Sequence, residues 1–191
     1  MPVTHNMFEG DLVRVRAIRS EDAPIFHAAN EDTDAQRSGY FVPWPQSPER
    51  DAAWSEEKAK KTNDGDNVQL AIETLDGQLV GAINAHGCEP LHRTFEYGIA
   101  LFRGHWGHAY AADAIRVLLR YMFDERNYQK ASAIVYAFNE KSIRMHEKVG
   151  FVREGLIRRH HYTNGEYHDV IWFGMTDDEF RAQGWQAAST Q

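Results

Sequence analysis

One apolar stripe in the middle of the chain constrains the fold more than any other feature. Beyond Gly107, apolar residues recur with helical spacing, at Ala111, Ala114, Ile115, Leu118, Leu119, Met122 and Phe123. The segments on either side alternate apolar and polar residues, which is typical of half-buried strands. We therefore expect a long helix that packs on a β-sheet.

Two-residue turn motifs that are typical of β-hairpins separate several of the strand-like segments. Asp76-Gly77 joins Val68–Thr74 to Leu79–Asn84, and Thr94–Leu101 is the third member of this antiparallel set. Asn164-Gly165 marks a last hairpin. Further strands are expected at 12–18, at 131–138 and from Gly150-Phe151 onward.

Helix start signals separate these strands. Ser20-Glu21-Asp22 supplies an N-cap and first-turn acids, and Ser47-Pro48-Glu49 begins a charged helix that should run to about Thr62. The aromatic segment Tyr40–Pro45 between them cannot be helical because of its prolines. Short helices are expected at 140–149 and 177–183. The sequence predicts an α+β fold with a mostly antiparallel mixed sheet and helices on both faces, in a single domain over residues 1–191 with its core at about 12–180.

Composition excludes several classes of function. The 191 residues include 42% hydrophobic ones and a single cysteine, Cys88, so an intramolecular disulfide is impossible. A net charge of −7, with basic residues interspersed, argues against a nucleic-acid partner. No apolar run approaches the ~20 residues that cross a bilayer, and the scattered histidines lack metal-ligand spacing. We expect a cytoplasmic protein without metal, membrane or nucleic-acid partners.

The turn before the long helix is a candidate ligand site. It contains Trp106, Gly107, His108, Ala109, Tyr110 and Ala111, and three of these six are glycine or alanine. Small side chains let a ligand approach the backbone, and the free amides of a first helical turn suit a pyrophosphate. By local pattern alone an ordinary strand-to-helix turn is the commoner explanation, and neither a Rossmann fingerprint nor a P-loop is present.

A second segment, Asn139 to Phe151, places five residues on one helix face. They are Asn139, Ser142, Ile143, His146 and Gly150, spaced i, i+3, i+4, i+7 and i+11. Such a face can meet one ligand. Asn139 fits an ordinary N-cap equally well, and a lone histidine on a helix is weak evidence of catalysis.

Both segments resemble motifs of the GNAT N-acetyltransferases. Residues 106–111 are similar to the acetyl-CoA signature Q/R-x-x-G-x-G/A in the W-G-K-G-Y-A form of Rim-type enzymes. Residues 139–151 resemble N-x-x-S-x-x-x-Y-x-K-x-G-F, and His92–Glu96 resembles H-R-x-x-E of spermidine N-acetyltransferases. Three positions depart from these patterns: Trp106 stands for Q/R, Ala109 for glycine and His146 for tyrosine.

The resemblance implies a GNAT fold and direct transfer of an acetyl group from acetyl-CoA to a primary amine in a ternary complex. It places residues 106–111 at the pyrophosphate, Asn139 and Ser142 at the pantetheine arm, and the backbone N–H groups of Leu101 and Phe102 at the oxyanion. Tyr40 and Trp44 would line the acceptor site.

The resemblance also suggests an acid and a base. Glu96, opposite Phe95 and Tyr97 by strand alternation, would accept the ammonium proton through water, although a solvated strand carboxylate fits as well. His146 would protonate or hydrogen-bond the thiolate. The acceptor remains open between a protein N-terminal amine, a polyamine and another small amine, and a homodimer is possible. The alternative function is a non-catalytic sensor that binds acyl-CoA.

Overall fold

The structure is a computed structural model that describes residues 6–61 and 65–184. Its centre is one seven-stranded sheet in the order β1-β2-β3-β4-β5-β7-β6. The strands are β1 (Val13–Ala17), β2 (Val68–Thr74), β3 (Leu79–Glu89), β4 (Thr94–Leu101), β5 (Lys130–Tyr136), β6 (Val152–Thr163) and β7 (Glu166–Thr176). Neighbouring strands are antiparallel, except that β4 and β5 run parallel.

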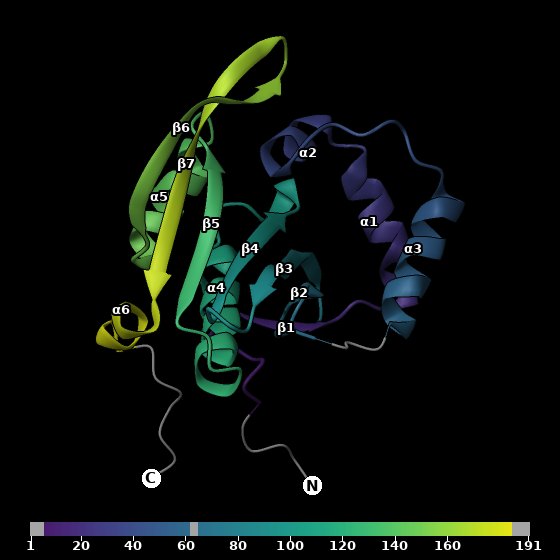
Figure 1. The fold of residues 1–191 in the computed structure, drawn as a ribbon. Coiled ribbons are helices and arrows are strands. Elements are labelled where there is room, and N and C mark those ends of the chain that lie inside the picture. Colours follow the sequence, from purple (N-terminus) through teal and green to yellow (C-terminus); the bar gives the residue numbers. More distant parts are fainter. Residues whose placement is uncertain (1–5, 62–64, 185–191) are drawn as a thin grey trace, which may run out of the picture.

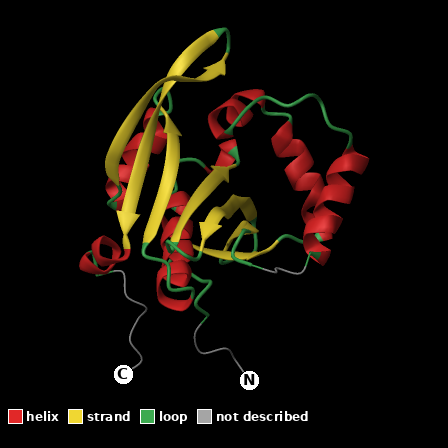
Figure 2. Ribbon diagram, in the orientation of Figure 1, coloured by secondary structure: helices red, strands yellow, loops and turns green. Residues whose placement is uncertain are grey.

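Helices cover both faces of this sheet. One layer consists of α4 (Tyr110–Arg120), its π-helical extension η3 (Tyr121–Glu125) and α5 (Glu140–Val149). The other layer consists of α1 (Ala23–Asn30), α2 (Thr33–Gly39) and α3 (Pro48–Lys60), which form a separate group beside β4 (Figures 1 and 2). The short elements are η1 (Ser20–Asp22), η2 (Arg103–His105) and α6 (Asp177–Ala182). The α+β architecture expected from the sequence is confirmed.

The apolar stripe of α4 packs as its spacing predicts. Ile115, Leu118 and Leu119 are almost fully buried in the main core, and each such side chain contributes about 1.5–3 kcal/mol. Asp113 on the same helix is also buried because it accepts hydrogen bonds from the backbone N–H groups of residues 11–13. This carboxylate joins α4 to the start of β1.

Strands β4 and β5 separate part of the way along their length. Their pairing covers Thr94↔Lys130, Phe95↔Ala131 and Glu96↔Ser132 and ends there. Beyond Glu96 the two strands diverge (Figure 1). The backbone of residues 97–101 therefore has one side without a strand partner.

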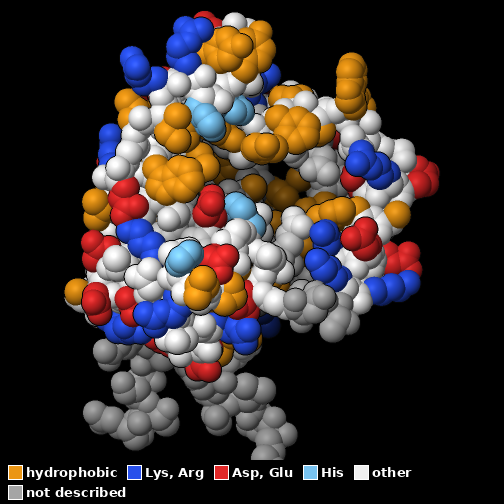
Figure 3. All heavy atoms as spheres, in the orientation of Figure 1, with side chains coloured by type: hydrophobic (Ala, Val, Ile, Leu, Met, Phe, Trp, Pro, Cys, Tyr) orange, Lys and Arg blue, Asp and Glu red, His pale blue; other side chains and the backbone are white. Residues whose placement is uncertain are grey.

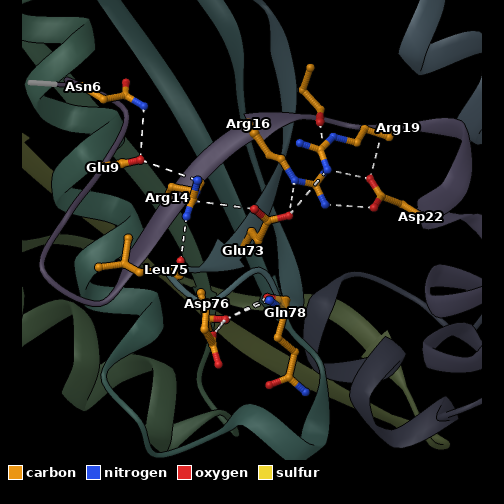
Figure 4. A network of polar contacts seen from close by, with 12 residues as sticks. Asn6, Glu9, Arg14, Arg16, Arg19, Asp22, Glu73, Leu75, Asp76 and Gln78 are labelled. Carbon is orange, nitrogen blue, oxygen red and sulfur yellow. Dashed lines mark hydrogen bonds and ion pairs between the residues drawn. The ribbon is translucent and has the colours of Figure 1, made fainter. Parts of the chain in front are cut away.

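A buried ion network connects the sheet to the helical group (Figure 4). Arg16 on β1 contacts Glu73 on β2 at 2.6 Å and donates to both oxygens of Asp22 at 2.8 and 2.9 Å. Burial acts most strongly and raises the pKa of Asp22, but the hydrogen bonds from Arg16 and from the Arg19 N–H, together with the charges of both arginines, outweigh it, so that the pKa is lowered. The network fixes the start of the α1–α3 group to the edge of the sheet.

Three elements differ from the expectation: one helix was not predicted, and two strands end elsewhere. Helix α2 was not predicted because its seven residues carry no apolar stripe; Asp32 caps it by accepting from the Ala35 N–H at 3.0 Å. Strand β3 continues to Glu89, and β5 ends at Tyr136 because the Asn139 N–H turns back to the Tyr136 carbonyl. The expected end of α3 at Thr62 lies outside the described residues. Within the described ranges, no helix is long and apolar enough to cross a membrane.

Candidate active site

The turn before α4 presents a row of backbone amides. Ala109 is the N-cap of α4 and makes no side-chain capping hydrogen bond. In the described part of the chain, no acceptor takes a hydrogen bond from the N–H groups of residues 107–112. Free amides at the positive end of a helix dipole form an anion site of the size of a phosphate.

Alanine replaces the motif glycine at position 109, where the backbone is left-handed. Its φ of 62° lies in the left-handed region, which glycine adopts without cost and alanine adopts with about 1–2 kcal/mol of strain. Gly107 also has a positive φ, of 87°, and a Cβ there would meet no atom within 4 Å. The surface beside this turn is therefore open to a ligand.

The side chain of Trp106 contacts the end of β4. Its indole Nε1 donates to the Leu101 carbonyl at 2.8 Å, and its ring lies between the cationic groups of Arg103 and Lys141, at 5.0 and 5.1 Å. The His108 ring stacks on Tyr110 at 5.4 Å. The side chains of Trp106, His108 and Tyr110 are thus engaged with neighbouring residues, which leaves the backbone of the turn as its binding surface.

The diverging part of β4 offers further backbone groups, but Phe102 is not among them. The Phe102 N–H donates to the Val80 carbonyl at 2.9 Å, within the sheet. The sequence-based assignment of Phe102 as an oxyanion donor is therefore corrected. Because successive residues of a strand direct their amides to opposite sides, Leu101 and Ile99 direct theirs toward the gap. The sequence analysis did not propose Ile99 as an oxyanion donor, because only the pairing register of β4 with β3 shows which backbone N–H groups have no hydrogen-bond partner.

The start of α5 uses Asn139 as a cap. Its side-chain oxygen accepts from the Ser142 N–H at 3.1 Å, so the ordinary structural explanation of this residue holds. Its side-chain amide nitrogen has no hydrogen-bond partner among the described residues. Asn139 can therefore cap the helix and donate to a ligand at once.

His146 lies in the core of the protein. The residue is 3% exposed, and its ring is surrounded by Tyr97, Phe151 and Phe173, with ring centroids at 5.9, 5.5 and 5.3 Å. Burial lowers the pKa of His146 to about 4, although the Ser142 carbonyl, 2.8 Å from Nδ1, acts to raise it.

This setting corrects the idea of an imidazolium acid. The contact with the Ser142 carbonyl places the proton on Nδ1, so the neutral ring has a lone pair at Nε2. Nε2 is buried and has no hydrogen-bond partner among the described residues, and the same is true of the Tyr97 hydroxyl. In this form His146 can accept a hydrogen bond at Nε2 but cannot donate a proton there.

Glu96 lies on the opposite face of β4 and belongs to a polar row. Its side chain is about one-third exposed, and its carboxylate is 3.8 Å from Nε2 of His86, which is its cross-strand neighbour on β3. Nδ1 of His86 contacts the side-chain oxygen of Asn84 at 3.0 Å. Sequence reasoning missed Asn84 and His86, although the strand register places His86 opposite Glu96.

A pocket of about 910 Å³ opens on this same face of the sheet. It lies between the α1–α3 group and the ends of β3 and β4, where Ala82 and Ala100 form part of its floor. Figure 3 shows a hollow with a mainly hydrophobic lining at this place. Trp44 stands at its rim, whereas Tyr40 does not line it: the Tyr40 ring contacts Phe41 and its carbonyl accepts from the Tyr136 hydroxyl at 3.4 Å.

Comparison with known proteins defines the class to which this fold and site belong. Residues 13–152 match the family described as the acetyltransferase (GNAT) domain, and the chain belongs to that family. It is an N-acetyltransferase that uses acetyl-CoA as its acetyl donor.

Several similar proteins are named as N-acetyltransferases. An uncharacterized N-acetyltransferase, YokL, from the SPbeta prophage of Bacillus subtilis is 37% identical over 180 residues, 94% of this chain and 97% of the relative. Spermidine N(1)-acetyltransferase of Vibrio cholerae is 25% identical over 156 residues, 82% of this chain and 88% of the relative. A crystal structure of the Vibrio cholerae spermidine N-acetyltransferase with CoA and spermine has a TM-score of 0.77 at 23% identity, and covers 88% of this chain and 98% of its own.

The described residues fit acetyl-CoA without a metal site. The free amides before α4 suit a pyrophosphate, and the gap between β4 and β5 offers unpaired amides to a pantetheine arm. Among the described residues, no group of three His, Cys, Asp or Glu side chains could hold a metal ion.

Proposed function

We propose that this enzyme acetylates a primary amine held on the Glu96 face of β4, by direct attack on acetyl-CoA bound at the α4 turn. The observation that carries the proposal is the position of Glu96. It is the last residue of β4 that pairs with β5, and its partly exposed carboxylate points to the face that holds the pocket. The two substrates would approach from opposite faces of the sheet and meet where the strands part.

The protein supplies proton removal and charge stabilisation in this mechanism. An ammonium has a reference pKa of ~10, so it must lose a proton before its nitrogen can attack the thioester carbonyl. Glu96 takes that proton through water, and His86, half exposed beside it, lies on the route to solvent. The N–H of Ile99, which is three residues from Glu96 and directed toward the gap, stabilises the oxyanion before the C–S bond breaks, whereas the Leu101 N–H is left for the pantetheine arm.

We propose His146 as a neutral packing residue beside the gap, not as the acid. A thiol titrates at about 8.5, so the departing thiolate is a good leaving group and can collect its proton from water. The expectations of a cytoplasmic location, a possible homodimer and the lack of nucleic-acid or membrane partners stay predictions.

The variant Glu96→Gln tests the proposal. It should lower kcat by roughly 10²- to 10⁴-fold, the range of positioned proton transfer, and leave acetyl-CoA affinity unchanged. Glu125→Gln, at an exposed carboxylate on η3, is the matched control and should keep full activity. An unchanged kcat for Glu96→Gln on a verified acceptor would show that this carboxylate is only a solvated strand residue.

A further inference from the structure

The pocket on the Glu96 face of the sheet contains few charges, and they balance. Its ionisable lining side chains, among the described residues, are Asp32, Asp51, Arg50 and Arg103. The rest of the lining is mainly apolar and includes the rings of Phe26, Phe41, Trp44, Trp54 and Phe102. An acceptor bound in this pocket is therefore surrounded mainly by apolar side chains.

Both carboxylates of the lining are already engaged. Asp32 holds Arg103 through a two-pronged ion pair whose longer contact is 2.7 Å, and this partner lowers the pKa of Asp32 to about 2. Asp51 is buried and contacts Nδ1 of His27 at 2.6 Å. Arg50 has no ion-pair partner among the described residues. The lining thus offers no free anion and one free cation.

This charge pattern selects against a polyamine. After one amine of spermidine reaches Glu96, two ammonium groups remain, and a buried charge is costly unless it is paired. In this pocket they would meet paired carboxylates and the Arg50 guanidinium. A second ammonium therefore has no favourable place.

The rim of the pocket favours an apolar body instead. Trp44 is 88% exposed and Phe41 is 55% exposed, and the two belong to a connection that Pro43 and Pro45 stiffen. Clustered exposed aromatic rings beside a pocket are typical of a ligand-binding surface, because a ligand removes their apolar area from water. A volume of about 910 Å³ lies in the range of pockets that hold drug-sized molecules.

We infer that the acceptor is a monoamine with an aromatic or aliphatic body, and that polyamines are poor substrates, in contrast to the relatives named for spermidine. The inference rests on the proposed function, since it takes this pocket as the acceptor site. The ammonium would point to Glu96 and the apolar body would lie between Phe41, Trp44 and the floor of the pocket. Glu96 and Ala100 lie on the same face of β4, four residues or about 13 Å apart, a separation that a bound amine and the water that leads to Glu96 span together.

Thiol release from acetyl-CoA, measured with tryptamine and with spermidine, tests the inference. Tryptamine should have a kcat/KM roughly tenfold or more above that of spermidine, since only spermidine brings unpaired charges into the pocket. An equal or higher kcat/KM for spermidine would overturn the inference and leave the proposed function standing. Absence of thiol release with either amine would contradict the proposed function as well, and the inference with it.

Two variants with matched controls extend the test. Arg50→Glu should raise kcat/KM for spermidine roughly twofold to fivefold, the worth of a partly exposed ion pair, whereas Lys148→Glu, an equal charge change on α5, should not. Trp44→Ala should lower kcat/KM for tryptamine roughly tenfold, whereas Leu91→Ala, an exposed residue away from the pocket, should not. If Arg50→Glu has no more effect on spermidine than its control, or Trp44→Ala no more effect on tryptamine than its control, the pocket does not select the acceptor by these contacts.

Discussion

Replacing His146 by phenylalanine should make the protein more resistant to acid. The ring lies between Tyr97, Phe151 and Phe173, with no partner for Nε2 among the described residues, so only its neutral form suits the site. Phenylalanine keeps a flat ring among these aromatic neighbours and removes the group that titrates. It also loses the contact of Nδ1 with the Ser142 carbonyl, which costs about 1 kcal/mol at any pH.

The size of the pH effect follows from the pKa of His146. Burial lowers it from 6.5 to about 4, while the unfolded chain keeps the ordinary value. The unfolded state therefore binds the proton first as the pH falls, and the free energy of unfolding declines from about pH 6.5 down to about pH 4. With 1.36 kcal/mol per pKa unit, the loss is about 2 kcal/mol at pH 5 and about 3 kcal/mol below pH 4.

Urea unfolding at pH 8 and at pH 5, followed by circular dichroism, measures this difference. The native protein should lose about 2 kcal/mol more than His146→Phe between the two values, because all other titrating groups are common to both. His92→Phe, at an exposed histidine, is the matched control and should behave like the native protein. If the native protein and His146→Phe lose the same stability between pH 8 and pH 5, then His146 is not a buried neutral residue and the assignment of its role must be reversed.

Three further changes should have measurable effects. Ala109→Gly should relieve the left-handed backbone strain, gain about 1 kcal/mol and raise Tm by about 2–4 °C in calorimetry; a lower Tm would contradict the strain. Ala109→Trp should weaken acetyl-CoA binding in titration calorimetry, because a bulky side chain beside the free amides obstructs a phosphate, and an unchanged Kd would place the pyrophosphate elsewhere. Asp22→Asn should lower the free energy of unfolding in urea by about 3 kcal/mol, because Arg16 stays buried with only Glu73 as a charged partner. Glu21→Gln, at the exposed neighbour, should change it very little. Equal effects of the two variants would show that the network is not needed for stability.

The fold could be predicted from the sequence because its strongest signals are local. The helical spacing of apolar residues in α4 and the turn pairs Asp76-Gly77 and Asn164-Gly165 depend only on neighbours in the chain. Helix α2 escaped prediction for the opposite reason. It is a short polar helix held by the Asp32 cap and by an ion pair with Arg103, seventy-one positions further along the chain.

The candidate site was less accessible to sequence reasoning. The motif residues of the α4 turn lie consecutively in the sequence, so resemblance could find them, and the structure adds the free amides. The assignment of Phe102 failed because strand register decides which amides are free. The neutral state of His146 could not be predicted from its position in the helix, because two of the rings that bury it come from the distant strands β4 and β7. The contact of His86 with Glu96 and the paired state of Asp51 likewise depend on contacts between different elements.

The most direct test of the account is a single reaction in which two products are counted. The protein is mixed with acetyl-CoA and tryptamine, free thiol is measured, and the amine is examined by mass spectrometry. The account predicts one acetylated amine for each thiol released, and a strong reduction of both products with Glu96→Gln. Tight binding of acetyl-CoA without thiol release, or thiol release without an acetylated amine, would contradict it.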